Sequence, residues 1–145
     1  MAVPEPAPEM ARNDHRGAVA AGRHFMALRD HAVTYQDERH LAPMCSPESR
    51  WCEGAVAVYK RWRLSSDDPQ RTMSTTVLGT RAGPHEDGVT WTVELDVERF
   101  ETVTHEDVQT GAVTLEAAAP LVMTVYLELR REDDGRWVVL AHSWG

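Results

Sequence analysis

The chain has 145 residues, which suits one ordinary domain, and its apolar content of 42% and charged content of 26% are typical of globular proteins. Its formal net charge of −8 disfavours a nucleic-acid partner, because the phosphate backbone would repel it. No apolar run approaches the roughly 18 residues that span a bilayer. The Pro/Ala/Glu-rich start lacks the pattern of a signal peptide, which leaves the cytoplasm and an exported mature chain both open.

The first twelve residues predict a disordered lead-in, because three prolines in eight residues oppose a helix. We therefore expect one domain over 13–145. A first helix should begin at Asn13 or Asp14, which can cap free backbone N–H groups, and end near Gln36. Its apolar positions recur at helical spacing; they are Ala18, Ala21, Phe25, Leu28, Ala32 and Tyr35.

A second helix should follow a short turn. Ser46 is a good N-cap residue, Pro47 suits the first helical position, and Glu48 complements the positive helix end. The polar stretch 65–69 should end this helix. Its expected buried stripe comprises Cys52, Ala55, Val56, Tyr59 and Trp62.

The rest of the chain predicts strands. The pattern over 72–81 is weak, whereas 89–97 and 121–129 alternate apolar and polar residues as half-buried strands do. Residues 105–111 should form a polar connection, and 132–135 a hairpin turn before a last strand over 136–144. Helices followed by an antiparallel meander define an α+β domain with the helices on one side of a curved sheet.

The register of the last strand has two solutions, because a slip of one residue turns every side chain to the opposite face. A three-residue loop with Gly135 in a left-handed bulge turns Trp137, Val139 and Ala141 inward, and the Asp-Asp-Gly order favours this loop. A loop of two or four residues instead turns inward Val138, Leu140, His142 and Trp144.

Cys45 and Cys52 are the two cysteines of the chain. We hypothesise a disulfide that clamps the entry loop to the second helix and implies an oxidising compartment. Two reduced, buried thiols are the alternative. A redox pair is disfavoured because the C-x-x-C spacing is absent.

The seven histidines show no metal-ligand spacing, and no phosphate-binding glycine loop is present, so we expect neither a metal nor a cofactor. His142 is a weak catalytic candidate. With Tyr59, Tyr126 or Asp96 nearby it would form an acid/base pair in a pocket. A histidine hydrogen-bonded to the backbone is the alternative.

The turn Asp134-Gly135-Arg136-Trp137-Val138-Val139 resembles a motif of the nuclear-transport-factor-2-like (SnoaL-like) superfamily. The run Ala32 to Asp37, followed by Leu41, Ser46-Pro47 and Cys52, is similar to actinobacterial lipoprotein domains of unknown function within that superfamily. This resemblance implies a cone-like (cystatin-like) α+β barrel, in which N-terminal helices lean over a strongly bent antiparallel sheet and enclose a pocket.

The expected pocket residues are Tyr59, Trp62, Trp91, Val125 and His142. We expect a non-catalytic binding or accessory domain, extracytoplasmic or associated with the cell envelope, that captures a small apolar ligand or a protein partner on its concave face. One alternative is a small-molecule isomerase or dehydratase that uses His142 with a carboxylate. Another is a structural module that forms a homodimer through the outer sheet face.

Overall fold

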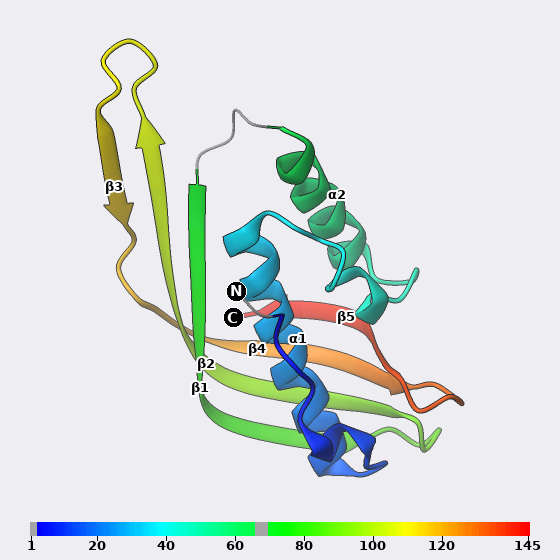
Figure 1. Cartoon of the computed structure of the whole chain (residues 1–145). Coiled ribbons are helices and arrows are strands. Elements are labelled where there is room, and N and C mark those ends of the chain that lie inside the picture. Colours follow the sequence, from blue (N-terminus) through cyan, green and yellow to red (C-terminus); the bar gives the residue numbers. More distant parts are fainter. Residues whose placement is uncertain (1–2, 66–69) are drawn as a thin grey trace.

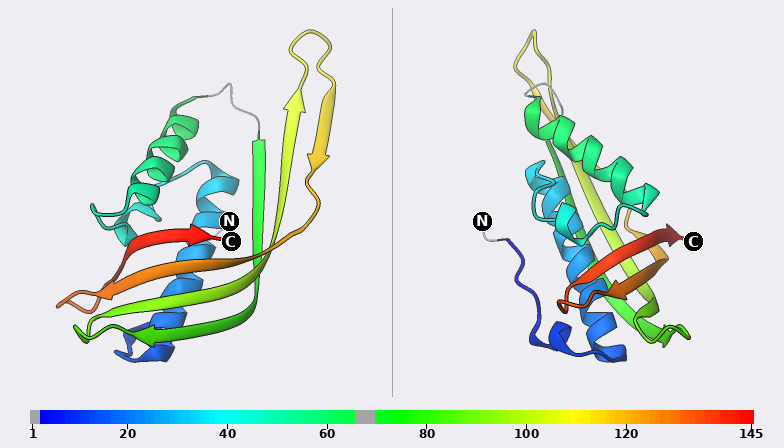
Figure 2. Two further views of the ribbon diagram at one scale, coloured as in Figure 1. Left: turned by 180° about the vertical axis from the view of Figure 1, so that it is seen from behind. Right: turned by 90° about the vertical axis from the view of Figure 1, so that its right-hand side faces the viewer.

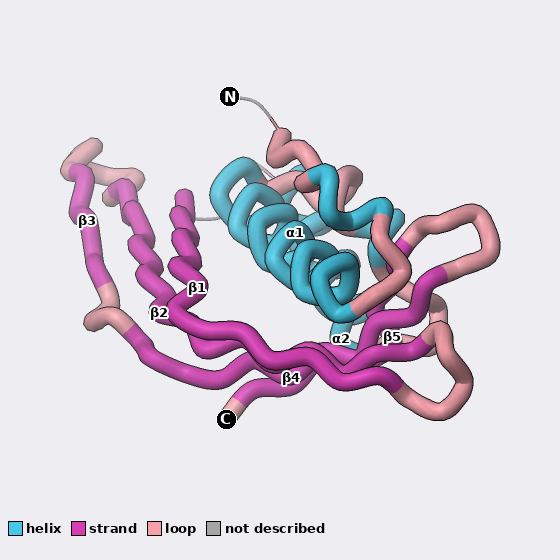
Figure 3. The backbone as a smooth tube through the Cα atoms, turned by 90° about the horizontal axis from the view of Figure 1, so that it is seen from below, coloured by secondary structure: helices cyan, strands magenta, loops and turns pink. Residues whose placement is uncertain are grey.

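Two helices lie on the concave side of one curved antiparallel sheet (Figures 1 and 3). The computed structural model describes residues 3–65 and 70–145. The sheet order is β1-β2-β4-β5, and β3 pairs with β2 beyond the end of β4. The expected α+β architecture is confirmed. The elements are η1 (Pro8–Ala11), α1 (His15–Tyr35), η2 (Ala42–Met44), α2 (Arg50–Leu64), β1 (Gln70–Pro84), β2 (Thr90–Glu106), β3 (Val113–Ala117), β4 (Leu121–Arg131) and β5 (Trp137–Trp144).

Helix α1 begins and ends where the sequence predicts. The Asp14 carboxylate accepts a hydrogen bond from the Gly17 N–H at 3.1 Å, and Gln36 ends the helix in the left-handed region with φ at 52°. The predicted apolar face is buried except at its last position, Tyr35, which is 40% exposed.

Part of the segment that we expected to be disordered instead packs against the domain. Residues 8–11 form the short helix η1, and the Trp137 indole N–H donates to the Met10 carbonyl at 2.9 Å. Arg131 donates to the Ala11 carbonyl at 3.0 Å. Figure 2 shows this segment running along α1. Residues 1 and 2 of the expected lead-in lie outside the described residues.

Helix α2 begins three residues later than the cap prediction placed it. Ser49, rather than Ser46, caps the helix and accepts from the Cys52 N–H at 3.2 Å. The Ser46 N–H instead donates to the Val139 carbonyl at 3.0 Å, because residues 45–46 pair with the free edge of β5. The four residues 66–69 of the expected helix-ending stretch lie outside the described residues.

The expected stripe of α2 is only partly buried. Cys52 and Tyr59 are buried, whereas Ala55, Val56 and Trp62 remain half-exposed. Among the described elements, α2 contacts the sheet mainly through β5.

The strands are longer than the sequence pattern predicts. β1 extends to Pro84, and β2 continues to Glu106, so the expected polar connection begins as strand. The unexpected strand β3 then returns along the end of β2, and both project beyond the helices (Figure 1). All five β3 residues are exposed, which explains why it lacks the alternation of a half-buried strand.

Both predicted solutions for the last strand are partly correct. Gly135 has φ at 87°, and the Glu132 N–H donates to the Arg136 carbonyl at 2.7 Å, as the three-residue bulged loop requires. This register buries Val139 opposite Leu129. A second irregularity then skips Leu140, so that His142 pairs with Leu127 and also turns inward.

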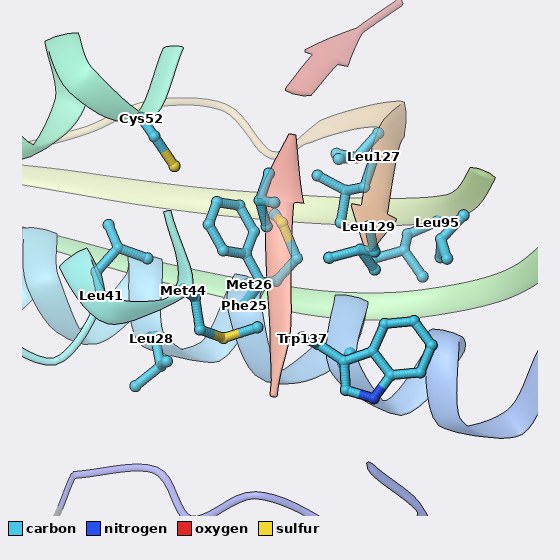
Figure 4. Packing of buried hydrophobic residues seen from close by; sticks show 14 of the residues in the cluster. Phe25, Met26, Leu28, Leu41, Met44, Cys52, Leu95, Leu127, Leu129 and Trp137 are labelled. Atoms are coloured by element: carbon cyan, nitrogen blue, oxygen red, sulfur yellow. The ribbon is translucent and has the colours of Figure 1, made fainter. Parts of the chain in front are cut away.

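The core forms where α1 crosses the sheet (Figure 4). Phe25 and Met26 from α1 pack in one cluster with Leu95, Leu127 and Leu129 from the strands. The predicted disulfide is confirmed: Cys45 and Cys52 are bonded, with their Cα atoms 5.6 Å apart. The bond ties the end of η2 to the first turn of α2.

Candidate functional site

Two hollows lie beside α2 on the concave side of the sheet. The first, which we call the Trp51 hollow, has a volume of about 390 Å³. The second, the Trp62 hollow, measures about 170 Å³ and lies against β1 and β2. Tyr59 lines both, so the two hollows share this residue. The Trp51 hollow is lined by Arg29, Arg50, Trp51, Gly54, Ala55, Val58 and Tyr59.

Arg29 is a buried cation beneath the Trp51 hollow. Its side chain comes from α1, and the residue is only 7% exposed. The guanidinium lies 5.1 Å from the Trp51 ring centroid, and its Nε atom has no hydrogen-bond partner among the described residues. Burial lowers the pKa of Arg29, and nearby Tyr59 opposes this shift. The guanidinium nevertheless remains charged at neutral pH.

His142 lies in an aromatic box under the same hollow. Its ring stacks on Trp51 with centroids 4.2 Å apart, and it also contacts Phe25 and Trp144. Burial and the Arg29 charge lower the pKa of His142 to about 3, so the imidazole is neutral at pH 7. The Arg29 guanidinium lies 3.5 Å from His142 Nε2, and Nδ1 is buried without a hydrogen-bond partner among the described residues.

Asp30 connects α1 to β1. Its carboxylate accepts hydrogen bonds from both the backbone N–H and the hydroxyl of Thr75, each at 2.8 Å. Burial raises the pKa of Asp30 to about 6, although these hydrogen bonds oppose the shift. Both oxygens of the Asp30 carboxylate therefore accept hydrogen bonds from β1, and the carboxylate makes no hydrogen bond to His142.

The Trp62 hollow has a second arginine–tryptophan pair. The Arg71 guanidinium lies 4.4 Å from the Trp62 ring centroid, and its NH1 atom is buried without a hydrogen-bond partner among the described residues. The Tyr59 and Trp62 rings are 5.3 Å apart. Glu101 also lines this hollow and forms an ion pair of 3.5 Å with Arg99.

The five pocket residues expected from the sequence occupy three different places. Tyr59 and Trp62 line the hollows, and His142 lies beneath Trp51. Val125 is fully buried in the core, and Trp91 lies on β2 opposite Leu129, toward the start of that strand. The structure therefore brings the first three residues to the site and leaves the last two in the packed sheet.

Of the three partners considered for His142, Tyr59 lines both hollows, whereas Asp96 and Tyr126 lie on the other face of the sheet. Asp96 binds Arg81 and the Thr124 hydroxyl there, which lowers its pKa to about 2. Tyr126 alternates with the buried β4 residues and is 40% exposed. Within the described part of the chain, no carboxylate contacts His142.

The sequence analysis missed Arg29 and Trp51. Arg29 follows Phe25 by four residues and precedes Ala32 by three, so it occupies the predicted apolar face of the first helix. A charged residue inside an apolar stripe was the available signal. Trp51 gave no such signal, because its neighbours on α2 do not reveal that His142 packs against it.

Larger hollows lie elsewhere on the molecule. A hollow of about 620 Å³ separates residues 5–9 from the outer side of α1, and another of about 470 Å³ lies beside Trp137. Both are walled partly by the N-terminal segment. Neither combines a buried arginine with a stacked aromatic pair, so we place the candidate site at the Trp51 hollow.

The curved sheet with helices in its concavity defines the nuclear-transport-factor-2-like α+β fold, as the sequence motif predicts. No family model matches the chain, and no curated protein matches its sequence. ActVI-ORFA from Streptomyces coelicolor is similar in structure, with a TM-score of 0.58 and 17% identity over 89% of this chain and 94% of that one.

Two other solved structures share this fold. The intermembrane-space region of chloroplast protein ARC6 has a TM-score of 0.57 and 16% identity, covering 92% of this chain and 97% of its own. A type 2 hexachlorocyclohexane dehydrochlorinase, LinA, has a TM-score of 0.56 and 14% identity, covering 89% and 84%. These likenesses concern the fold. Among the described residues, no helix is both long and apolar enough to cross a lipid bilayer.

Proposed function

We propose that this protein is a small-molecule binding domain whose ligand occupies the Trp51 hollow and extends past Tyr59 toward the Trp62 hollow. The observation that carries this proposal is the pair of hollows that share Tyr59 and are lined by the aromatic side chains of Trp51, Tyr59 and Trp62. Concave sites with aromatic walls and a few polar groups are typical ligand sites.

Binding is favoured over acid/base catalysis by the state of His142. A general base works best with a pKa near the operating pH, whereas the pKa of His142 is about 3. Asp30, which has the suitably raised pKa of about 6, is hydrogen-bonded to Thr75 instead. The site thus provides shape, aromatic surface and charge, but lacks the proton-transfer pair that an isomerase or dehydratase would need.

The proposed setting is outside the cytoplasm. The Cys45–Cys52 disulfide supports this, because such bonds persist in oxidising compartments. The fold leaves catalysis open: among the similar structures, LinA is named as a dehydrochlorinase, while the ARC6 region carries no enzyme name. The non-catalytic assignment therefore depends on the residues of this site.

Filling the Trp51 hollow tests the proposal. Ala55 lines it, whereas Ala57 is exposed on the same helix. We expect a library of aromatic fragments, followed by saturation-transfer NMR, to yield ligands that bind the wild type and Ala57→Phe but not Ala55→Phe. Circular dichroism would verify that both variants are folded. Fragments that bind Ala55→Phe as well as the wild type would contradict the site, and so would a wild type that binds none.

A further inference from the structure

The Trp51 hollow carries positive charge in an acidic protein. The chain has 23 acidic and 15 basic residues, yet the residues lining this hollow include two arginines and no carboxylate. Arg99 adds to the positive field, since its charge lowers the pKa of both Arg29 and His142. A local field opposite to the net charge concentrates anions at this site.

Arg29 makes no direct ion pair, and the Asp30 carboxylate that acts on it electrostatically is hydrogen-bonded to Thr75. Among the described residues, neither Arg29 nor Arg50 forms an ion pair. The side-chain contacts that the structure defines for the Arg29 guanidinium are with the His142 imidazole, the Trp51 ring and Tyr59, whereas Asp30 acts on it only through its charge. Burying a cation without an anion costs free energy, and an anion that reaches it recovers part of that cost. The Arg29 guanidinium is therefore positioned to bind a negatively charged group.

We propose that the ligand is an aromatic carboxylate. Its carboxylate binds Arg29, with Arg50 at the rim, and its ring packs against Trp51 and Tyr59. This inference depends on the function proposed above and specifies the ligand class. Planar guanidinium groups match carboxylates with two parallel hydrogen bonds, and aromatic walls favour an aromatic body. His142 is a positioning residue, since its neutral ring holds Trp51 on one side and Arg29 at Nε2.

Two probes of the same shape and different charge test this assignment: naphthalene-2-carboxylate and naphthalene-2-carboxamide. Tryptophan fluorescence titration should show that the wild type binds the carboxylate at least about tenfold more tightly, as expected for a charged hydrogen bond that the amide lacks. Arg29→Gln should abolish this preference. Arg61→Gln removes an exposed arginine of helix α2 and should retain the preference.

A measurement on the unaltered protein covers the case in which Arg29→Gln does not fold. The Nε–H resonance of Arg29 should shift on addition of the carboxylate and stay unchanged with the carboxamide. Equal affinity for both probes would overturn the ligand class and leave the binding function standing. A carboxylate preference that survives in folded Arg29→Gln would overturn the role of Arg29. If neither probe binds, the aromatic carboxylate is overturned, while the Ala55→Phe experiment judges the binding function separately.

Discussion

The imidazole of His142 on β5 lies nearly parallel to the indole of Trp51 on α2, with the ring centroids 4.2 Å apart and the planes inclined by 11°. This stack joins the last strand of the sheet to the second helix. It exists because the irregularity at Leu140 returns His142 to the inner face after Trp137 and Val139 have already pointed inward.

Acid should weaken the fold through His142. The folded protein keeps this imidazole neutral down to about pH 3, whereas the unfolded chain protonates it near pH 6.5. Between these values the unfolded state binds more protons, so the free energy of unfolding falls as the pH falls. His142→Leu should flatten this dependence, measured as urea unfolding from pH 7 to 4. An unchanged slope would contradict the neutral, buried imidazole.

Asp30 should act in the opposite direction. Its pKa is about 6 in the folded state and near 3.8 when unfolded, so the folded protein holds an extra proton between these values. Stability should therefore decrease as the pH rises from 4 to 6, by at most about 3 kcal/mol. Asp30→Asn should remove this decrease in urea unfolding curves, whereas exposed Asp133→Asn should not. If the stability of Asp30→Asn changed with pH in parallel with that of the wild type, the raised pKa of Asp30 would be refuted.

The disulfide should contribute measurably to stability. Its two cysteines are seven residues apart, and closing so short a loop stabilises by roughly 2.5 kcal/mol in the chain-entropy model. The double variant Cys45→Ala/Cys52→Ala should lose about this much in urea unfolding. Alkylation of the unreduced, unfolded wild type should add no mass, and alkylation after reduction should modify both thiols. Two labelled cysteines without reductant would show that the bond is absent.

Two helical glycines should respond oppositely to alanine. A Cβ on Gly17 would lie 1.9 Å from the Arg12 carbonyl oxygen, whereas a Cβ on Gly54 would have no neighbour within 4 Å. We expect Gly54→Ala to raise the free energy of unfolding by about 0.5–1 kcal/mol. Gly17→Ala should lower it by about 1 kcal/mol or more, because backbone must move. Thermal melts of the two variants provide the measurement, and stabilisation by Gly17→Ala would refute the close packing of residue 12.

Much of the architecture follows from the sequence alone. The cap at Asp14, the end at Gln36, the alternation in β2 and β4 and the bulged turn at Gly135 depend on interactions between residues close in the chain. Helical and strand periodicities are local properties, so they reveal the elements and their buried faces. The Cys45–Cys52 bond is similarly local, since seven residues separate its partners.

The residues of the candidate site could be identified only from the tertiary structure. Strand periodicity predicts that alternate residues along the whole of β5 point inward. The irregularity at Leu140 shifts this alternation by one residue, so that His142 also points inward. Likewise, Ser46 is a residue type that often caps helices, yet its backbone N–H donates to a carbonyl at the edge of β5. Arg29 becomes an unpaired cation only because α1, α2 and β5 meet around it. Local patterns determine which face of an element is apolar, whereas burial of a charge depends on which distant elements exclude water from it.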